Sequence, residues 1–155
     1  MDFADLVRGF GQKIGVDLSV DEDGLCALNI DDMRVSIQNI DEVGLVSVFG
    51  EIGDPPPQGL EELLLAMLSA NHLFQGTSGA TISRDPETQK FYLCRCDVSS
   101  VLDLETFSSN LEKFVNTLET WRKLVADYRP VAGEKEGREG PEMAEAPGLG
   151  GFMQV

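Results

Sequence analysis

The sequence predicts a single α+β domain, with elements in the order α-β-β-β-α-β-β-α and a small twisted antiparallel sheet flanked by helices. Three observations predict this class. Three segments repeat apolar residues at intervals of three and four, the spacing of one helix face. Five short apolar runs of strand length lie between them, separated by acidic or proline-containing turns. The length of 155 residues suits one hydrophobic core.

The first helix is predicted over residues 3–14. Asp2 stands where a helix N-cap would lie, and Gly15 follows as a typical C-terminal glycine. The apolar residues at helical spacing are Phe3, Leu6, Val7, Phe10 and Ile14.

Three strands are predicted next, and they form an antiparallel meander because the turns between them are short and acidic. Asp31-Asp32 and Asp41-Glu42 are the turn residues. The strands cover residues 25–30, 33–38 and 45–50. Apolar side chains occur on both faces of these strands, and the predicted helices leave one face of the meander uncovered.

The segment 53–59 contains three consecutive prolines, which cannot donate to a sheet, so the third strand ends there. A second helix is predicted over residues 60–73, followed by strands over 80–84 and 90–96 around a hairpin loop. The last element is a long helix over residues 103–128, with Asp103 as N-cap.

The second helix is apolar on most of its circumference, which is typical of a helix that is either central in a monomer or shared with a partner. Two-fold symmetric dimers are the commonest oligomers, so we favour a homodimer. The residues predicted for its interface are Leu63, Leu64, Met67, Leu68 and His72.

The composition disfavours several partners. With 27 Asp and Glu against 12 Lys and Arg, the formal net charge is -15, which repels nucleic acid and anionic membranes. The apolar run 63–68 is too short to span a bilayer. Three cysteines and a start without a secretory leader predict reduced thiols and a cytosolic location.

No catalytic constellation or cofactor motif is recognisable, so we predict a protein that is not an enzyme and has neither cofactor nor metal. His72 is the one histidine, and its apolar surroundings favour packing over catalysis. Cys26, Cys94 and Cys96 could join it as zinc ligands, but they lack the paired spacing of structural zinc sites.

Residues 129–155 differ in composition from the preceding chain. Glycine and proline supply 9 of these 27 residues, and five acids against three bases give the segment a net charge of only -2. Such a segment buries too little apolar surface to offset the entropy of ordering it. We therefore predict a folded domain over 1–128 and a disordered tail over 129–155.

Four segments together resemble the class I type III secretion chaperones of the CesT (Tir chaperone) family. FGQKIGVDLSVDEDGLCALNIDD (10–32) is similar to the family's junction of first helix and first strand. VSVFGEIGDPPP (46–57) resembles its strand and proline loop, and LLLAMLSANHLF (63–74) resembles its interface helix. LETFSSNLEKFVNTLETW (104–121) is similar to its final helix.

The resemblance implies a homodimer in the bacterial cytoplasm that binds the N-terminal region of a secreted effector in extended form. Such chaperones keep the effector secretion-competent and help deliver it to the secretion ATPase, without hydrolysing ATP themselves. On this reading, the residues expected to contact the effector are Phe10, Ile14, Leu28, Ile30, Val35, Ile37, Val46 and Val48. The alternative is a non-secretory regulator or adaptor of YbjN-like fold.

Overall fold

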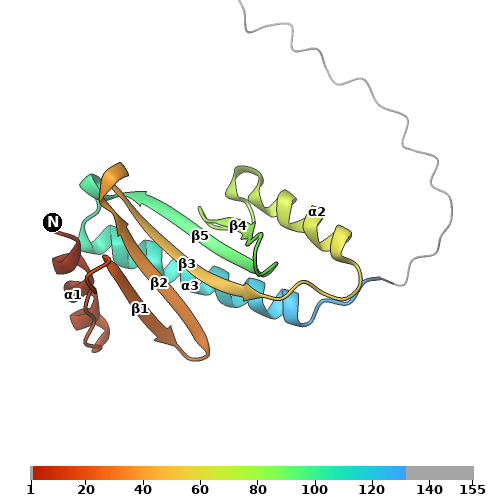
Figure 1. Cartoon of the computed structure of the whole chain (residues 1–155), viewed down its shortest axis with the longest axis horizontal. Coiled ribbons are helices and arrows are strands. Elements are labelled where there is room, and N and C mark those ends of the chain that lie inside the picture. Colours follow the sequence, from red (N-terminus) through yellow and green to blue (C-terminus); the bar gives the residue numbers. More distant parts are fainter. Residues whose placement is uncertain (1, 132–155) are drawn as a thin grey trace, which may run out of the picture.

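The computed structural model describes residues 2–131, and within this range one five-stranded antiparallel sheet is flanked by three α-helices (Figure 1). The predicted class and element order are confirmed. The helices are α1 (Phe3–Ile14), α2 (Leu60–Asn71) and α3 (Leu104–Ala126). The strands are β1 (Leu25–Ile30), β2 (Met33–Ile40), β3 (Leu45–Gly53), β4 (Thr81–Arg84) and β5 (Phe91–Val98).

The strands lie in the order β1-β2-β3-β5-β4, so β1 and β4 form the two edges of the sheet. One row of paired residues runs Leu28–Val35–Gly50–Leu93–Ile82. Since directly paired residues point to the same face, this row identifies the face that packs into the core.

Helix α3 covers this face of the sheet, and α1 packs beside it near β1 (Figure 1). A Cβ added at Gly50 would lie 2.5 Å from Leu118 Cδ2, so the missing side chain lets α3 lie close to β3. The rings of Phe10 and Phe107 meet edge to face, with centroids 5.7 Å apart. One core therefore joins both helices to the sheet.

The opposite face of the sheet mixes small, polar and apolar side chains, all partly or fully exposed. Among them are Ala27, Ser36, Ser47, Phe49, Cys94 and Cys96. Cys94 and Cys96 lie on one face, as their spacing predicts. The expectation of one uncovered sheet face therefore agrees with the described structure, although that face is less apolar than the sequence suggests.

Strands β2, β3 and β5 are each longer than predicted, because their ends continue into polar or glycine-containing segments. β3 runs to Gly53, after a register shift between Glu51 and Gly53, and ends just before the prolines. Asp103 is the N-cap of α3 as predicted, and its carboxylate accepts a hydrogen bond from the Thr106 N–H at 2.7 Å. Asp2 occupies the N-cap of α1, but its side chain makes no capping bond.

Helix α2 ends at Asn71, earlier than predicted, and a 3₁₀ turn follows from His72 to Phe74. The Asn71 side chain donates to the Ile82 carbonyl at 3.1 Å and accepts from the Ile82 N–H at 2.8 Å. Trp121 donates from Nε1 to the Gly76 carbonyl at 2.9 Å. These bonds join α2 and the loop after it to β4 and α3.

Gly11 lies inside α1, where glycine is unfavourable, but a Cβ at this position would lie 2.5 Å from the Val16 carbonyl oxygen. Glycine is therefore required there for the turn after α1 to fold back on the helix. At the other end, Tyr128 donates to the Gly59 carbonyl at 3.1 Å. The predicted tail lies outside the described residues from residue 132 onward, so the division at 128/129 stays a prediction.

Candidate functional site

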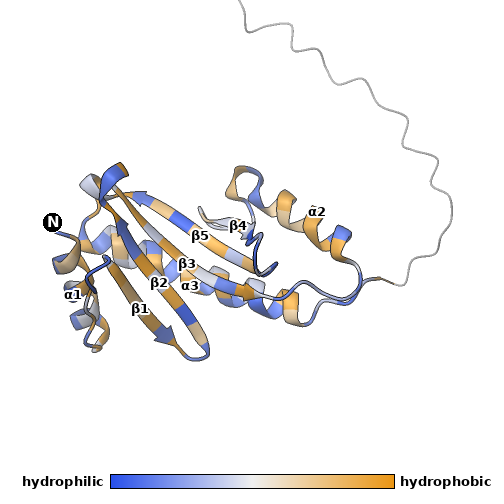
Figure 2. Cartoon of the chain, viewed as in Figure 1, coloured by the Kyte–Doolittle hydropathy of each residue, from blue (hydrophilic) through white to orange (hydrophobic). Residues whose placement is uncertain are grey.

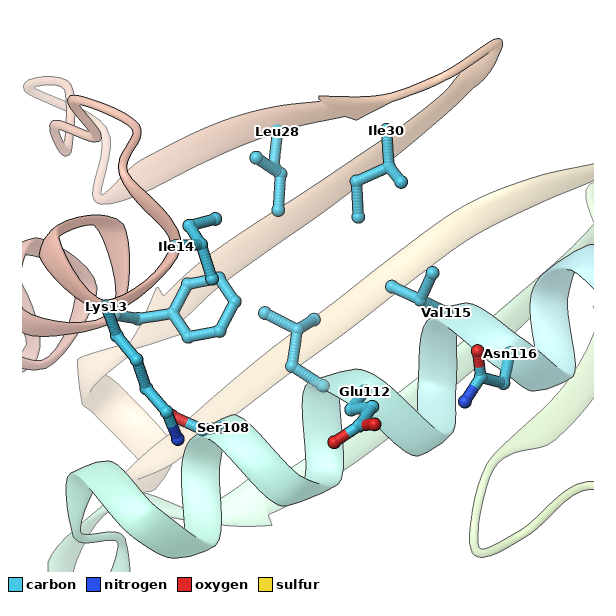
Figure 3. A pocket seen from close by; sticks show the side chains of 10 residues that line it. Lys13, Ile14, Leu28, Ile30, Ser108, Glu112, Val115 and Asn116 are labelled. Atoms are coloured by element: carbon cyan, nitrogen blue, oxygen red, sulfur yellow. The ribbon is translucent and has the colours of Figure 1, made fainter.

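An apolar groove of about 360 Å³ lies between α1, β1 and α3 (Figure 3). In this view, Leu28 and Ile30 point from β1 toward α3, with Ile14 beside them and Val115 opposite. The lining residues are Phe10, Lys13, Ile14, Leu28, Ile30, Ser108, Leu111, Glu112, Val115 and Asn116.

The groove has a closed apolar floor and a partly open wall. Phe10 and Leu28 are buried at 8% and 3% exposure, whereas Ile14 remains 43% exposed. Among the described residues, 2–131, the lining contains two charged side chains, Lys13 and Glu112, whose charges cancel. Such a surface gains free energy by covering apolar area and selects little by charge.

The outer edge of β1 runs alongside this groove. Gly24 accepts from the Asn39 N–H at 3.0 Å, so its carbonyl points toward β2. Leu25 instead bonds to Asp21 through both its N–H and its carbonyl, each at 2.9 Å, and therefore points away from β2.

Because backbone groups alternate along a strand, Ala27 and Asn29 also point outward, and no bond to their outward groups occurs within residues 2–131. The groove thus lies next to a free strand edge. An extended peptide could add to that edge while placing alternate side chains in the groove.

The structure brings together half of the predicted client-binding residues and separates the rest. Phe10, Ile14, Leu28 and Ile30 all line the groove. The others lie on the inner strands β2 and β3 in the core, and none of them lines the groove. That part of the prediction is corrected, and it concerns Val35, Ile37, Val46 and Val48.

The sequence reasoning missed the contribution of α3 to the groove. Leu111 and Val115 form its opposite wall, with Lys13 and Glu112 at the rim. Val115 could have been noticed, since it is an apolar residue one position beyond Phe114 and off the main apolar stripe of α3.

Helix α2 is apolar over most of its length (Figure 2), but only one of its faces lies in the core. Leu63 and Met67 are 1% and 3% exposed, so the structure removes them from the predicted interface. Leu64 is half-buried, while Leu68 and His72 are exposed. The large apolar side chains that α2 and its 3₁₀ turn expose are Leu65, Leu68, Leu73 and Phe74.

Two of these exposed residues have unusual backbone angles. Leu73 and Phe74 have φ values of 50° and 57°, in the left-handed region that side chains other than glycine rarely adopt. Two exposed apolar side chains thus stand on a strained stretch of backbone. The sequence pattern alone cannot reveal this.

The thiols show no arrangement that suggests catalysis. Burial raises the pKa of the Cys26 thiol, with the nearby Asp21 carboxylate adding to the effect, so it is less reactive than an ordinary thiol. Burial also raises the pKa of Cys94, whose Sγ lies 3.6 Å from Ser83 Oγ. Within residues 2–131, no three His, Cys, Asp or Glu side chains gather as metal ligands.

The helices of residues 2–131 include none with the length and apolarity that a membrane-spanning segment needs.

Solved structures share this fold. One is the ExsC–ExsE complex, with a TM-score of 0.67, 22% identity and coverage of 81% of this chain and 97% of that chain. Another is the Yersinia pestis type III secretion chaperone SycH with a fragment of YscM2, with a TM-score of 0.63, 19% identity and coverage of 77% and 99%. YbjN from E. coli is similar at a TM-score of 0.55, 15% identity and coverage of 79% and 90%.

At these identities the structures establish the fold alone, which both the chaperone reading and the YbjN-like alternative share. No curated protein matches the sequence. The family model of the Tir chaperone protein (CesT) family matches residues 5–122, which include the whole sheet and most of α1 and α3. The resemblance seen in the sequence is thereby confirmed, and the chain belongs to the Tir chaperone protein (CesT) family.

Proposed function

We propose that this protein is a type III secretion chaperone that binds the N-terminal region of a secreted effector in extended form. It keeps the effector soluble and secretion-competent in the bacterial cytoplasm and helps bring it to the secretion apparatus and its ATPase. The observation that carries the proposal is the apolar groove beside the free edge of β1. Family membership and the type III secretion chaperone SycH among the similar structures support it.

The groove suits an unfolded client better than a folded one. Its volume of about 360 Å³ admits a few side chains, and its free strand edge offers backbone hydrogen bonds that do not depend on sequence. Apolar side chains alternating along the client would fill the groove between Ile14, Leu28 and Val115. No catalytic step is needed for this role, since binding alone prevents the client from aggregating.

The test is co-expression with the secreted protein encoded beside this gene, followed by purification of the complex. Ile14→Asp places a charge in the groove wall and should weaken binding by about tenfold or more, because that charge would be covered without a partner. Val16→Asp is the matched control, since Val16 is 46% exposed against 43% for Ile14 and does not line the groove. Equal binding by the two variants would refute the groove as the client site.

We also propose that the protein is a homodimer whose interface is formed by α2 and the turn after it. Leu65, Leu68, Leu73 and Phe74 are between 52% and 74% exposed, which is unusual for four large apolar side chains so close in the chain. In a two-fold symmetric dimer, these four side chains of each copy would be covered by the same surface of the other copy. Leu63 and Met67 are not part of this proposed interface, because they are already buried in the core of one subunit.

Leu68→Asp should convert the dimer to a monomer, as measured by light scattering during size-exclusion chromatography. Val101→Asp is the control, because Val101 is 74% exposed in the turn after β5 rather than on α2. A Leu68→Asp protein with the mass of an intact dimer would contradict the proposed interface.

The YbjN-like alternative, a regulator or adaptor outside secretion, rests on a shared fold, whereas the family match of this chain is to the Tir chaperone protein (CesT) family. Secretion-apparatus genes beside this one would favour the chaperone.

A further inference from the structure

We infer that the groove is filled, when no client is bound, by residues 149–155 of the same chain, added as a strand to the free edge of β1. This inference rests on the proposed function of the groove and adds a competitor to it. The tail would act as a temporary occupant that a client must displace.

The C-terminal segment lies beyond the part of the chain that matches the shared fold. The ExsC–ExsE structure is covered over 97% of its length by only 81% of this chain. The family model ends at residue 122, and the described structure at 131. The 24 residues from 132 to 155 are therefore additional to the shared fold.

The second argument is the pattern of charge in the tail. All seven charged side chains after Val131 lie between Glu134 and Glu145, and residues 146–155 have none. The groove has no net charge and an apolar floor, so it favours an uncharged segment.

The third argument is the alternation of side chains. In an extended strand, residues two apart point to the same face. Leu149, Met153 and Val155 therefore share one face, with Gly151 between them. A strand paired to β1 with Gly151 opposite Leu28 would direct these three apolar side chains to the face of Leu28, which is the groove face.

The linker between the described structure and this segment is long enough to reach the groove. The groove touches α3 from Ser108 to Asn116, so it lies about 15–27 Å along the helix from Ala126. A fully flexible chain of 17 residues, the number from 132 to 148, would have a root-mean-square span of about 23 Å. Local concentration is highest when linker span and distance match, and it is then on the order of 1 mM.

The expected effect on clients follows from competition. If the segment alone binds the groove with a dissociation constant of about 0.1 mM, tethering fills about nine-tenths of the grooves. The apparent client affinity is reduced by the fraction of open grooves, which is about tenfold. Removing the tail contact should therefore tighten client binding by about tenfold.

The test uses the full chain with methyl-labelled Ile, Leu and Val in NMR. Leu149→Asp/Met153→Asp should shift the methyl signals of Ile14, Leu28, Ile30 and Val115, and a peptide of residues 146–155 should restore them. Met143→Asp/Ala144→Asp is the control, with the same added charge in the charged part of the tail. Unchanged groove signals in the first variant, or equal shifts in both, would overturn the inference.

Two further outcomes separate the possibilities. Groove signals that change as the wild-type protein is diluted would mean that the tail occupies another copy, which overturns the contact within one chain. If Ile14→Asp abolishes client binding while the tail variants shift nothing, the tail inference fails and the proposed function stands. If Leu149→Asp/Met153→Asp shifts the groove signals but Ile14→Asp does not weaken client binding, the tail is established as the occupant and the proposed client site is refuted.

Discussion

Gly50 gives the sharpest test of how α3 packs on the sheet. It lies in the middle of β3, and a Cβ there would be 2.5 Å from Leu118 Cδ2 and 3.4 Å from the Arg34 carbonyl oxygen. Leu118 is 0% exposed, so it has no free space to move into. The change Gly50→Ala therefore forces α3 and β3 apart or pushes Leu118 from its preferred rotamer.

The magnitude follows from two opposed effects. Alanine restricts the unfolded chain, and because Gly50 does not have a positive φ, this alone would stabilise the fold by about 0.4–1 kcal/mol. Overpacking a tight core costs about 1–3 kcal/mol. The packing cost prevails here because the close atom belongs to a buried side chain. We expect Gly50→Ala to lower the free energy of unfolding by about 1–2 kcal/mol.

The assay is urea unfolding followed by the fluorescence of Trp121, with a double-mutant cycle. Leu118→Ala alone should cost about 2–5 kcal/mol through the cavity it leaves. The double variant should lose less than the sum of the two, by about 1–2 kcal/mol, because the clashing methyl groups are gone. A Gly50→Ala protein at least as stable as the wild type, or a coupling energy near zero, would refute this account of the packing.

Three other changes have defined outcomes. Gly9→Ala should raise the unfolding free energy by about 0.5–1 kcal/mol, since its Cβ meets only the tip of Leu104 at 3.2 Å in a helix interior; a loss in urea unfolding would contradict this. Asn71→Ala should cost about 1–3 kcal/mol by removing both hydrogen bonds to Ile82, with faster amide exchange in β4 as the distinguishing signal. The Thr106 N–H lowers the pKa of Asp103, so its contribution to stability is complete above the unfolded pKa and is lost as pH falls through the folded one. The stability difference between wild type and Asp103→Asn should therefore shrink below about pH 4, and a constant difference across that range would argue against the cap.

Most of the fold could be predicted because its patterns are local. The apolar spacing of α3, the prolines after β3 and the acidic turns of the meander each act within a few residues. Element ends were less predictable, since β3 extends from its predicted end at Gly50 to Gly53, and a strand pattern does not favour glycine. Gly50 is explained only by Leu118, far away in sequence.

The candidate site was half predictable for a related reason. Alternation along a strand tells which residues share a face, but it cannot tell which face a helix will cover. Leu28 and Val35 share a face and pair directly across β1 and β2, yet Leu28 lines the groove and Val35 is fully enclosed. The difference arises because β1 is an edge strand and β2 is not. The predicted meander already places β2 between β1 and β3, but the pairing of β3 with β5, which leaves β1 as the edge, is a long-range property that the sequence pattern does not contain.

The two edges of the sheet also differ in a way that limits assembly. β4 is four residues long, and Asn71 occupies the backbone groups of Ile82 that would otherwise face a further strand. β1 keeps Ala27 and Asn29 open. Runaway growth of a sheet from copy to copy requires a donor edge and an acceptor edge on every molecule. A sheet with one open edge is closed by a single added strand. The protein can therefore bind an aggregation-prone polypeptide without nucleating a fibre.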